Sequence, residues 1–265
     1  MSSAESPPGG LGRAFRRGHP ALVAYVMAGY PDLAGSLGAL HALVDGGADL
    51  VELGVPYADP LADGPVIREA ARKARESNPG GFGLAETIKL AAAFLAPRDE
   101  APPLALMTYL NPMMKMGLPT AAAAMREAGV SGVIVPDLPP DMAPMWLSVS
   151  PGIDTVFLAA PTSTPERLAK VGEMSRGFVY CVSTTGVTGE RAELPAELSE
   201  LVARVKASTA LPVAVGFGVS TVAQAAVVAR VADGVVVGSA LVRRQADAQD
   251  LEQFCRELAQ AVHCG

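Results

Sequence analysis

Short apolar runs alternate with helical patterns eight times along almost the whole of this 265-residue chain. The runs are rich in Val, Leu and Ala and lack polar alternation, which is typical of parallel strands that are buried on both faces. The predicted strands are Ala21–Ala28, Leu50–Val55, Leu104–Leu110, Gly132–Pro136, Thr155–Ala160, Phe178–Ser183, Pro212–Gly216 and Gly234–Val237.

The segments between these runs have the periodicity of helices. They are predicted around Leu33–Asp45, Val66–Glu76, Leu84–Leu95, Thr120–Ala128, Asp141–Val149, Pro165–Met174, Pro195–Lys206, Thr221–Arg230 and Ala248–Val262, after a short N-terminal helix at Leu11–Arg17. Eight such βα units in roughly 250 residues fit an α/β fold of the (β/α)8 TIM-barrel type. We expect residues 11–265 to form this single domain and residues 1–10, which are rich in Ser, Pro and Gly, to be a flexible tail. An open doubly wound sheet is the alternative, but its usual fingerprint, GxGxxG after the first strand, is absent.

The composition narrows the class of function. The net charge of -6 and the pI of about 5.2 are not those of a nucleic-acid surface, which is normally basic. An odd number of cysteines, three, without ligand spacing indicates a reducing, cytoplasmic setting with neither a disulfide framework nor a zinc site. The start lacks the apolar core of a signal peptide. The apolar segment Val213–Val242 is interrupted by charged and polar residues, so no membrane span is predicted.

A glutamate in the second predicted strand stands out chemically. Glu52 lies inside an apolar run, where an unpaired charge is costly, so it must be paired, neutralised or functional. Two carboxylates, Asp59 and Asp63, follow in a loop punctuated by Pro and Gly. Glu52 and Asp63 are therefore a candidate acid/base pair. The alternative is structural: Glu52 forms a core salt bridge, and Asp63 caps the helix that begins near Pro65.

Three glycine-rich sites follow the last three predicted strands: Gly186–Gly189, Gly216–Gly218 and Gly238–Ser239. Glycine lets backbone N–H groups approach an anion closely, and barrels often bind phosphate at the last strand ends. These sites predict phosphate binding, although the same glycines would also suit tight turns. Tyr180, in the sixth strand, is either a core aromatic or a residue whose hydroxyl reaches Glu52 at the barrel mouth.

The sequence offers few residues for catalysis by lysine, histidine or a metal. None of the five lysines lies inside a predicted strand, so a Schiff-base mechanism has no obvious residue. The three histidines, His19, His41 and His263, lie outside the strand ends. We therefore expect neither a catalytic histidine nor a bound metal.

The chain resembles the α subunit of tryptophan synthase along nearly its whole length. The motifs that carry the resemblance are Glu52–Pro56 with Asp59–Pro65, Pro136–Pro139, Ser183 with Gly186–Gly189, and Val215–Gly218 with Gly238–Ala240. The resemblance implies a lyase of L-tryptophan biosynthesis that cleaves indole-3-glycerol phosphate to indole and glyceraldehyde 3-phosphate. It also implies an α2β2 heterotetramer with the β subunit, which carries pyridoxal phosphate, and no cofactor on this chain.

The resemblance assigns roles to single residues. It places the catalytic carboxylates at Glu52 and Asp63 and implies substrate or phosphate contacts at Tyr180, Thr188, Gly189, Gly218, Gly238 and Ser239. We expect the segment from Thr184 to Glu193 to close over the mouth, where Thr188 would meet Asp63. The sequence departs from the pattern common in the family at Met27, Tyr30 and Thr184.

Two other functions stay open from the sequence. One is another phosphate-binding barrel, such as an isomerase or a prenyl transferase, which would need the glycine sites but not both carboxylates. The other is a degenerate subunit that only activates a partner, which the changed loop residues favour and the intact carboxylates oppose.

Overall fold

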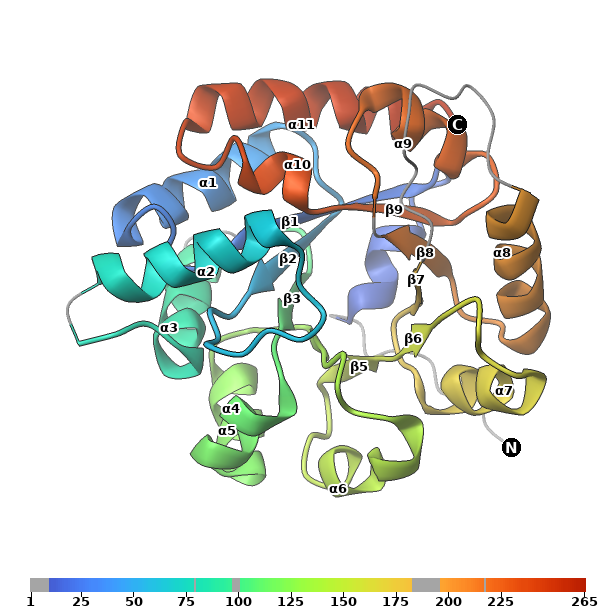
Figure 1. The fold of residues 1–265 in the computed structure, drawn as a ribbon, viewed down its shortest axis with the longest axis horizontal. Helices are drawn as coiled ribbons and strands as arrows, with labels where there is room; N and C mark the ends of the chain where they lie inside the picture. Colours follow the sequence, from blue (N-terminus) through green and yellow to red (C-terminus); the bar gives the residue numbers. More distant parts are fainter. Residues whose placement is uncertain (1–9, 79, 97–100, 183–195, 217) are drawn as a thin grey trace.

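The computed structural model describes residues 10–78, 80–96, 101–182, 196–216 and 218–265. Parallel strands form one sheet in the order β5-β4-β3-β2-β1-β9-β8-β7-β6, and helices surround it (Figure 1). The strands are β1 Ala21–Met27, β2 Leu50–Gly54, β3 Leu104–Met107, β4 Gly132–Ile134, β5 Asp154–Val156, β6 Leu158–Ala159, β7 Val179–Val182, β8 Val213–Gly216 and β9 Gly234–Val237.

The sheet closes into a barrel through a strand that is split in two. Only Phe157 separates β5 from β6, and together they form the single strand predicted at Thr155–Ala160. β5 pairs with β4 and β6 pairs with β7, so the order of strands runs around a ring. The backbone of Phe157 still bonds across the break, because its carbonyl accepts from Tyr180 N at 3.1 Å. The predicted (β/α)8 barrel is thereby confirmed.

The helices also follow the prediction closely. They are η1 Leu11–Phe15, α1 Leu33–Asp45, α2 Pro65–Ser77, α3 Leu84–Leu95, α4 Leu110–Met116, α5 Leu118–Glu127, η2 Pro140–Met142, α6 Pro144–Leu147, α7 Pro165–Met174, α8 Ala196–Ser208, α9 Val222–Ala229, α10 Ser239–Val242 and α11 Ala248–His263. Among the described residues, no helix is both long enough and apolar enough to cross a bilayer.

Two short helices were not predicted. The strand expected at Leu104–Leu110 ends at Met107, and Leu110 begins α4. The apolar run continues past the end of the strand because Tyr109 and Leu110 are also buried. The helix begins at Leu110 because its backbone N–H donates to Asp137 Oδ1 at 2.8 Å, and this carboxylate caps the start of α4. The second helix, α10, directly follows β9, where only a glycine turn was expected.

Apolar residues form two cores, one between the sheet and the outer helices and one inside the barrel. The short N-terminal 3-10 helix, η1, closes the amino end of the barrel. Leu11 is fully buried and donates its N–H to Asp154 Oδ2 at 2.8 Å. A Cβ on Gly132 would lie 2.4 Å from Leu11 Cδ1, so glycine is required where this plug meets β4. The carboxyl end of the barrel, where barrels of this type have their active sites, is not closed by this plug.

Candidate active site

Glu52 points into the barrel from the middle of β2. Its neighbours in the strand register are Tyr25 of β1 and Ala105 of β3, and both belong to the interior core. The residue is 1% exposed, and neither carboxylate oxygen has a hydrogen-bond partner among the described residues. Burial, and then the charge of Asp63, raise the pKa of Glu52 from 4.5 to about 8. The core salt bridge considered from the sequence is wrong, since no ion pair of Glu52 is present in the described part of the chain.

Asp63 lies in the loop between β2 and α2. The N-cap of α2 is Gly64, without a side-chain cap bond, and Pro65 is the first helical residue. The helix-cap role considered for Asp63 is therefore wrong. Burial raises the pKa of Asp63, while a hydrogen bond from Tyr109 and the charge of Arg68 lower it. Asp63 is thus a half-buried carboxylate, hydrogen-bonded to Tyr109, in the loop beyond the carboxyl end of β2.

Tyr109, which the sequence argument missed, holds the Asp63 loop. Its hydroxyl accepts from Ala62 N at 2.9 Å and is hydrogen-bonded to the Asp63 carboxylate. Burial and the nearby Asp63 charge raise the pKa of Tyr109, so the hydroxyl stays protonated and acts as a donor. The Tyr57 ring packs against the Tyr109 ring, with 5.3 Å between the ring centroids. The Tyr57 hydroxyl accepts a hydrogen bond from Asn111 Nδ2 at 2.7 Å. The sequence signal for this anchor is an aromatic residue directly beyond a strand end.

Two buried tyrosines flank Glu52 inside the barrel. Tyr180 is 5% exposed, and Tyr25, which the sequence argument also missed, is 3% exposed. Burial raises the pKa of both phenols well above the ordinary value, and the charges of Glu52 and Asp63 raise it further. Both rings lie against glycine: a Cβ on Gly54 would be 2.0 Å from Tyr25 Oη, and one on Gly216 would be 2.3 Å from Tyr180 Oη. Of the two alternatives considered for Tyr180, the hydrogen bond to Glu52 is not formed in the described structure.

The close contact at Gly216 gives a first prediction. In Gly216→Ala the new methyl group collides with the Tyr180 hydroxyl, so the ring must move away from its position near Glu52. We expect a loss of stability of about 1–3 kcal/mol, as for other overpacked cores, together with slower turnover. Chemical unfolding and kcat measure the two effects. Gly38→Ala, where a Cβ meets nothing within 4 Å, is the control. Wild-type stability and kcat in Gly216→Ala would contradict this packing.

The phosphate-site candidates lie at the carboxyl ends of neighbouring strands. Gly218 follows β8 and has a φ of 98°, which favours glycine. Gly238 and Ser239 follow β9 and begin α10, whose first amides have no acceptor within the helix. Since β7, β8, β9, β1 and β2 are consecutive in the sheet, these ends adjoin Tyr180 and Glu52. Thr188 and Gly189 lie outside the described residues.

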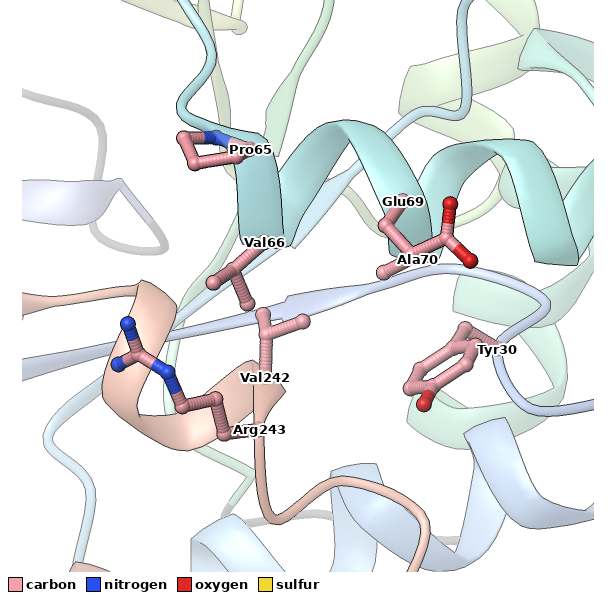
Figure 2. Close-up of a pocket in the computed structure, with 7 residues that line it drawn as sticks. All are labelled: Tyr30, Pro65, Val66, Glu69, Ala70, Val242 and Arg243. Carbon is pink, nitrogen blue, oxygen red and sulfur yellow. The ribbon is translucent and has the colours of Figure 1, made fainter.

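A cavity of about 340 Å³ lies between α2 and α10 (Figure 2). Its walls are Tyr30, Pro65, Val66, Glu69, Ala70, Val242 and Arg243. Val66 and Val242 face each other across it, and the Tyr30 ring lies below Glu69 and Ala70 in Figure 2. Because the two helices begin at the Asp63 loop and at Gly238, their packing links the position of the carboxylate to that of the glycine site.

Known proteins are similar to this chain in sequence and in fold. The sequence model of the family described as "Tryptophan synthase alpha chain" matches residues 12–264. The chain belongs to the tryptophan synthase alpha chain family. It is 44% identical over 263 residues to the tryptophan synthase alpha chain of Acidothermus cellulolyticus, covering 95% of this chain and 96% of that protein. It is 45% identical over 248 residues to the tryptophan synthase alpha chain of Mycobacterium tuberculosis, and the match covers 92% of this chain and 90% of that protein.

A solved structure agrees with the sequence relatives. The structure of M. tuberculosis tryptophan synthase in space group F222 superimposes with a TM-score of 0.89 at 43% identity, covering 98% of this chain and 100% of that one. The family predicted from the motifs is therefore confirmed. Of the departures from its common pattern, Met27 is buried in the barrel and its backbone is held by Gln245, whose Oε1 accepts from Met27 N at 2.8 Å. Thr184 lies outside the described residues.

Proposed function

We propose that Glu52 and Asp63 carry out the reaction of this alpha chain, the cleavage of indole-3-glycerol phosphate to indole and glyceraldehyde 3-phosphate. The observation that carries the proposal is the state of Glu52: a fully buried carboxyl group without a hydrogen-bond partner in the described structure. With a pKa of about 8, it is protonated at neutral pH. A polar group left unsatisfied at the mouth of a barrel is typical of a catalytic acid or base.

The retro-aldol cleavage needs two proton transfers, and Glu52 supplies both. The protonated carboxyl donates its proton to C3 of the indole, so that the ring becomes a leaving group. The resulting carboxylate then removes the proton from the glycerol hydroxyl beside the breaking bond. The bonding electrons return to the indole, the hydroxyl becomes the aldehyde of glyceraldehyde 3-phosphate, and Glu52 ends protonated as it began.

Asp63 stabilises the charge that this sequence creates. Protonation at C3 places positive charge on the indole nitrogen, and an ionised carboxylate there accepts the N–H and offsets the charge. Tyr109 orients Asp63, because its hydroxyl bonds both the carboxylate and the loop backbone at Ala62. Since both steps are proton transfers with charge stabilisation, we propose that the reaction uses no cofactor on this chain.

The glycines at the ends of β8 and β9 are proposed to hold the substrate phosphate, together with Ser239 and with Gly189 and Thr188 of the segment outside the described residues. Tyr180 is proposed to contact the substrate from β7. Of these positions, Gly218 and Gly238 follow β8 and β9, and only β1 separates β9 from β2, the strand that carries Glu52 and leads into the Asp63 loop. A phosphate held there would lie near Glu52 and Asp63.

A charge at Gly238 tests the phosphate assignment. Gly238→Asp should raise the KM for indole-3-glycerol phosphate by at least about tenfold, because a like charge beside the anion costs on the order of 1 kcal/mol or more. Gly238→Ala is the matched control, since its Cβ would meet Ile67 and Tyr25 only at 3.8 Å. Steady-state kinetics measure both variants. An unchanged KM in Gly238→Asp would mean that the glycine serves only the turn into α10.

We also propose that the chain acts in the cytoplasm as part of an α2β2 complex with a β subunit that carries pyridoxal phosphate. Two observations support this: the three cysteines are free, and the solved relative is named as tryptophan synthase. Copurification of the chain with its β subunit, followed by mass measurement of the complex, tests the stoichiometry.

Product analysis tests the function itself. The purified chain is incubated with indole-3-glycerol phosphate, with and without the β subunit, and both products are quantified. We expect indole and glyceraldehyde 3-phosphate in equal amounts. Conversion of the substrate to an isomer, without release of indole, would indicate the function of another phosphate-binding barrel, such as an isomerase. A chain that releases no indole but stimulates the β subunit would be a degenerate activator.

A further inference from the structure

A second group of chemically reactive side chains lies at the opposite end of the barrel. His19 precedes β1, Asp49 precedes β2, and His263 is the last residue of α11. One ring nitrogen of each histidine and one carboxylate oxygen all lie within 4.8 Å of one another. In the part of the chain that the structure describes, this is the one group of three such ligating side chains that comes this close.

Asp49 is the centre of the group, and its hydrogen bonds are incomplete. The side chain is 1% exposed. Its Oδ2 accepts from Leu22 N at 2.9 Å and lies 2.8 Å from His263 Nε2. Its Oδ1 is buried and has no hydrogen-bond partner among the described residues. The charged group that pairs with this oxygen is Arg17 Nη1, at 3.6 Å, which is too far for a hydrogen bond. A buried carboxylate oxygen without a hydrogen bond is costly.

His19 is oriented as metal-ligating histidines commonly are. His19 Nδ1 lies 3.0 Å from the carbonyl oxygen of Pro20. An N–H donated to that carbonyl leaves the lone pair on the other ring nitrogen, which is how backbone carbonyls orient ligating imidazoles. The His19 and His263 rings lie 3.9 Å apart between centroids.

From this arrangement we infer that His19, Asp49 and His263 bind one divalent transition-metal cation of the Zn²⁺ class. Two imidazoles and a carboxylate suit Zn²⁺, Co²⁺ or Ni²⁺, whereas Mg²⁺ and Ca²⁺ prefer oxygen ligands alone. The ligand atoms lie within 4.8 Å of one another, close to the separation that a shared cation about 2.0–2.2 Å from each of them requires. Water would complete the coordination on the side where His263 is partly exposed.

The site would tie both ends of the chain to the barrel. His19 follows the η1 plug, Asp49 begins β2, and His263 ends the C-terminal helix. The role is therefore structural, and the site is remote from Glu52, which faces the other end of the barrel. The sequence argument against a metal considered only carboxyl strand ends, while these three residues meet at the amino ends from distant parts of the chain.

Arg17 is the competing charge. Its Nη1 lies 3.6 Å from Asp49 Oδ1, and its side chain is 56% exposed. A guanidinium beside the carboxylate opposes a second cation, but an exposed arginine can move away at little cost. Replacing it with glutamine should therefore tighten metal binding, which a purely structural salt bridge would not predict.

The test is calorimetric titration of the chelator-stripped full chain with ZnCl₂. All proteins carry Cys264→Ser, because an exposed thiol next to His263 can bind zinc on its own. We expect one Zn²⁺ per chain and a rise in Tm that EDTA reverses. His19→Gln and His263→Gln should each weaken binding at least about tenfold, the smallest loss that removal even of an outer-shell partner causes. Arg17→Gln should bind more tightly.

His41→Gln is the matched control, since His41 packs near Phe94 on the outside of the barrel and is not part of the group. It should bind zinc like the parent, and kcat for indole release should not respond to zinc in any variant. Two results would overturn the proposal. One is the absence of saturable zinc binding by the parent chain, and the other is an unchanged affinity when both His19 and His263 are replaced.

Discussion

Glu52→Gln is expected to lower kcat for indole release by about 10²–10⁴, the loss that accompanies removal of one general acid–base group. The amide has nearly the same shape as the protonated carboxyl, but it can neither give a proton to C3 nor take one from the glycerol hydroxyl. Binding of the substrate phosphate should survive, because the proposed phosphate contacts lie on β8 and β9 rather than on β2. Stopped-time indole assays and a binding titration with glycerol 3-phosphate separate the two effects.

Stability provides the control for this variant. The pKa of Glu52 is about 8 in the folded chain against 4.5 ordinarily, so between these values the folded state binds more protons than the unfolded state. Stability of the wild type therefore falls as pH rises from about 4.5 to about 8. Glutamine does not titrate, so Glu52→Gln should lack this fall and be no less stable than wild type at pH 8. A near-normal kcat in a folded Glu52→Gln would remove the catalytic assignment.

Asp63→Asn is expected to lower kcat by about 10²–10³, as does the removal of other groups that stabilise developing charge. Asparagine keeps the size of the side chain and can still pair with Tyr109, so the loop should keep its place. What is lost is the negative charge beside the indole nitrogen. The same kinetic assay measures the loss, and the melting temperature should change little.

Asp59→Asn is the matched control for that charge. Asp59 lies in the same loop, four positions earlier, but is exposed. Its substitution removes an equal charge without touching the mouth, and kcat should stay within about twofold because exposed charges are screened. Equal losses in the two variants would mean that only the overall field matters, and a wild-type rate in Asp63→Asn would end the proposed role of Asp63.

The sequence was sufficient for the fold because the strands of a barrel are apolar on both faces. The helices Leu33–Asp45, Leu84–Leu95 and Pro165–Met174 have the predicted bounds, each set by a clear change of pattern. The α4 helix was missed because Tyr109 and Leu110 extend an apolar run beyond the strand end. Hydrophobicity records burial, and it does not record where a capping carboxylate such as Asp137 turns the chain.

The site was predictable only where a residue type conflicted with its surroundings. Glu52 stood out as a carboxylate inside an apolar strand, and its burial without a partner in the described structure agrees with that interpretation. Tyr25 and Tyr109 gave no such conflict, because a tyrosine in or beyond a strand is ordinary. Their importance comes from the strand register and from loop packing, which appear only in three dimensions. The proximity of His19 and His263 was missed for the same reason.

The central claim, that this alpha chain cleaves its substrate through a protonated Glu52, is tested most directly by the pH dependence of indole release. The purified chain is assayed with indole-3-glycerol phosphate well below its KM between pH 6 and pH 10, because kcat/KM reports the pKa values of the free chain. We predict that indole is released and that kcat/KM falls as pH rises through about 8, where Glu52 loses the proton that C3 requires. A kcat/KM that stays constant across this range, or no indole at any pH with or without the β subunit, would contradict the account.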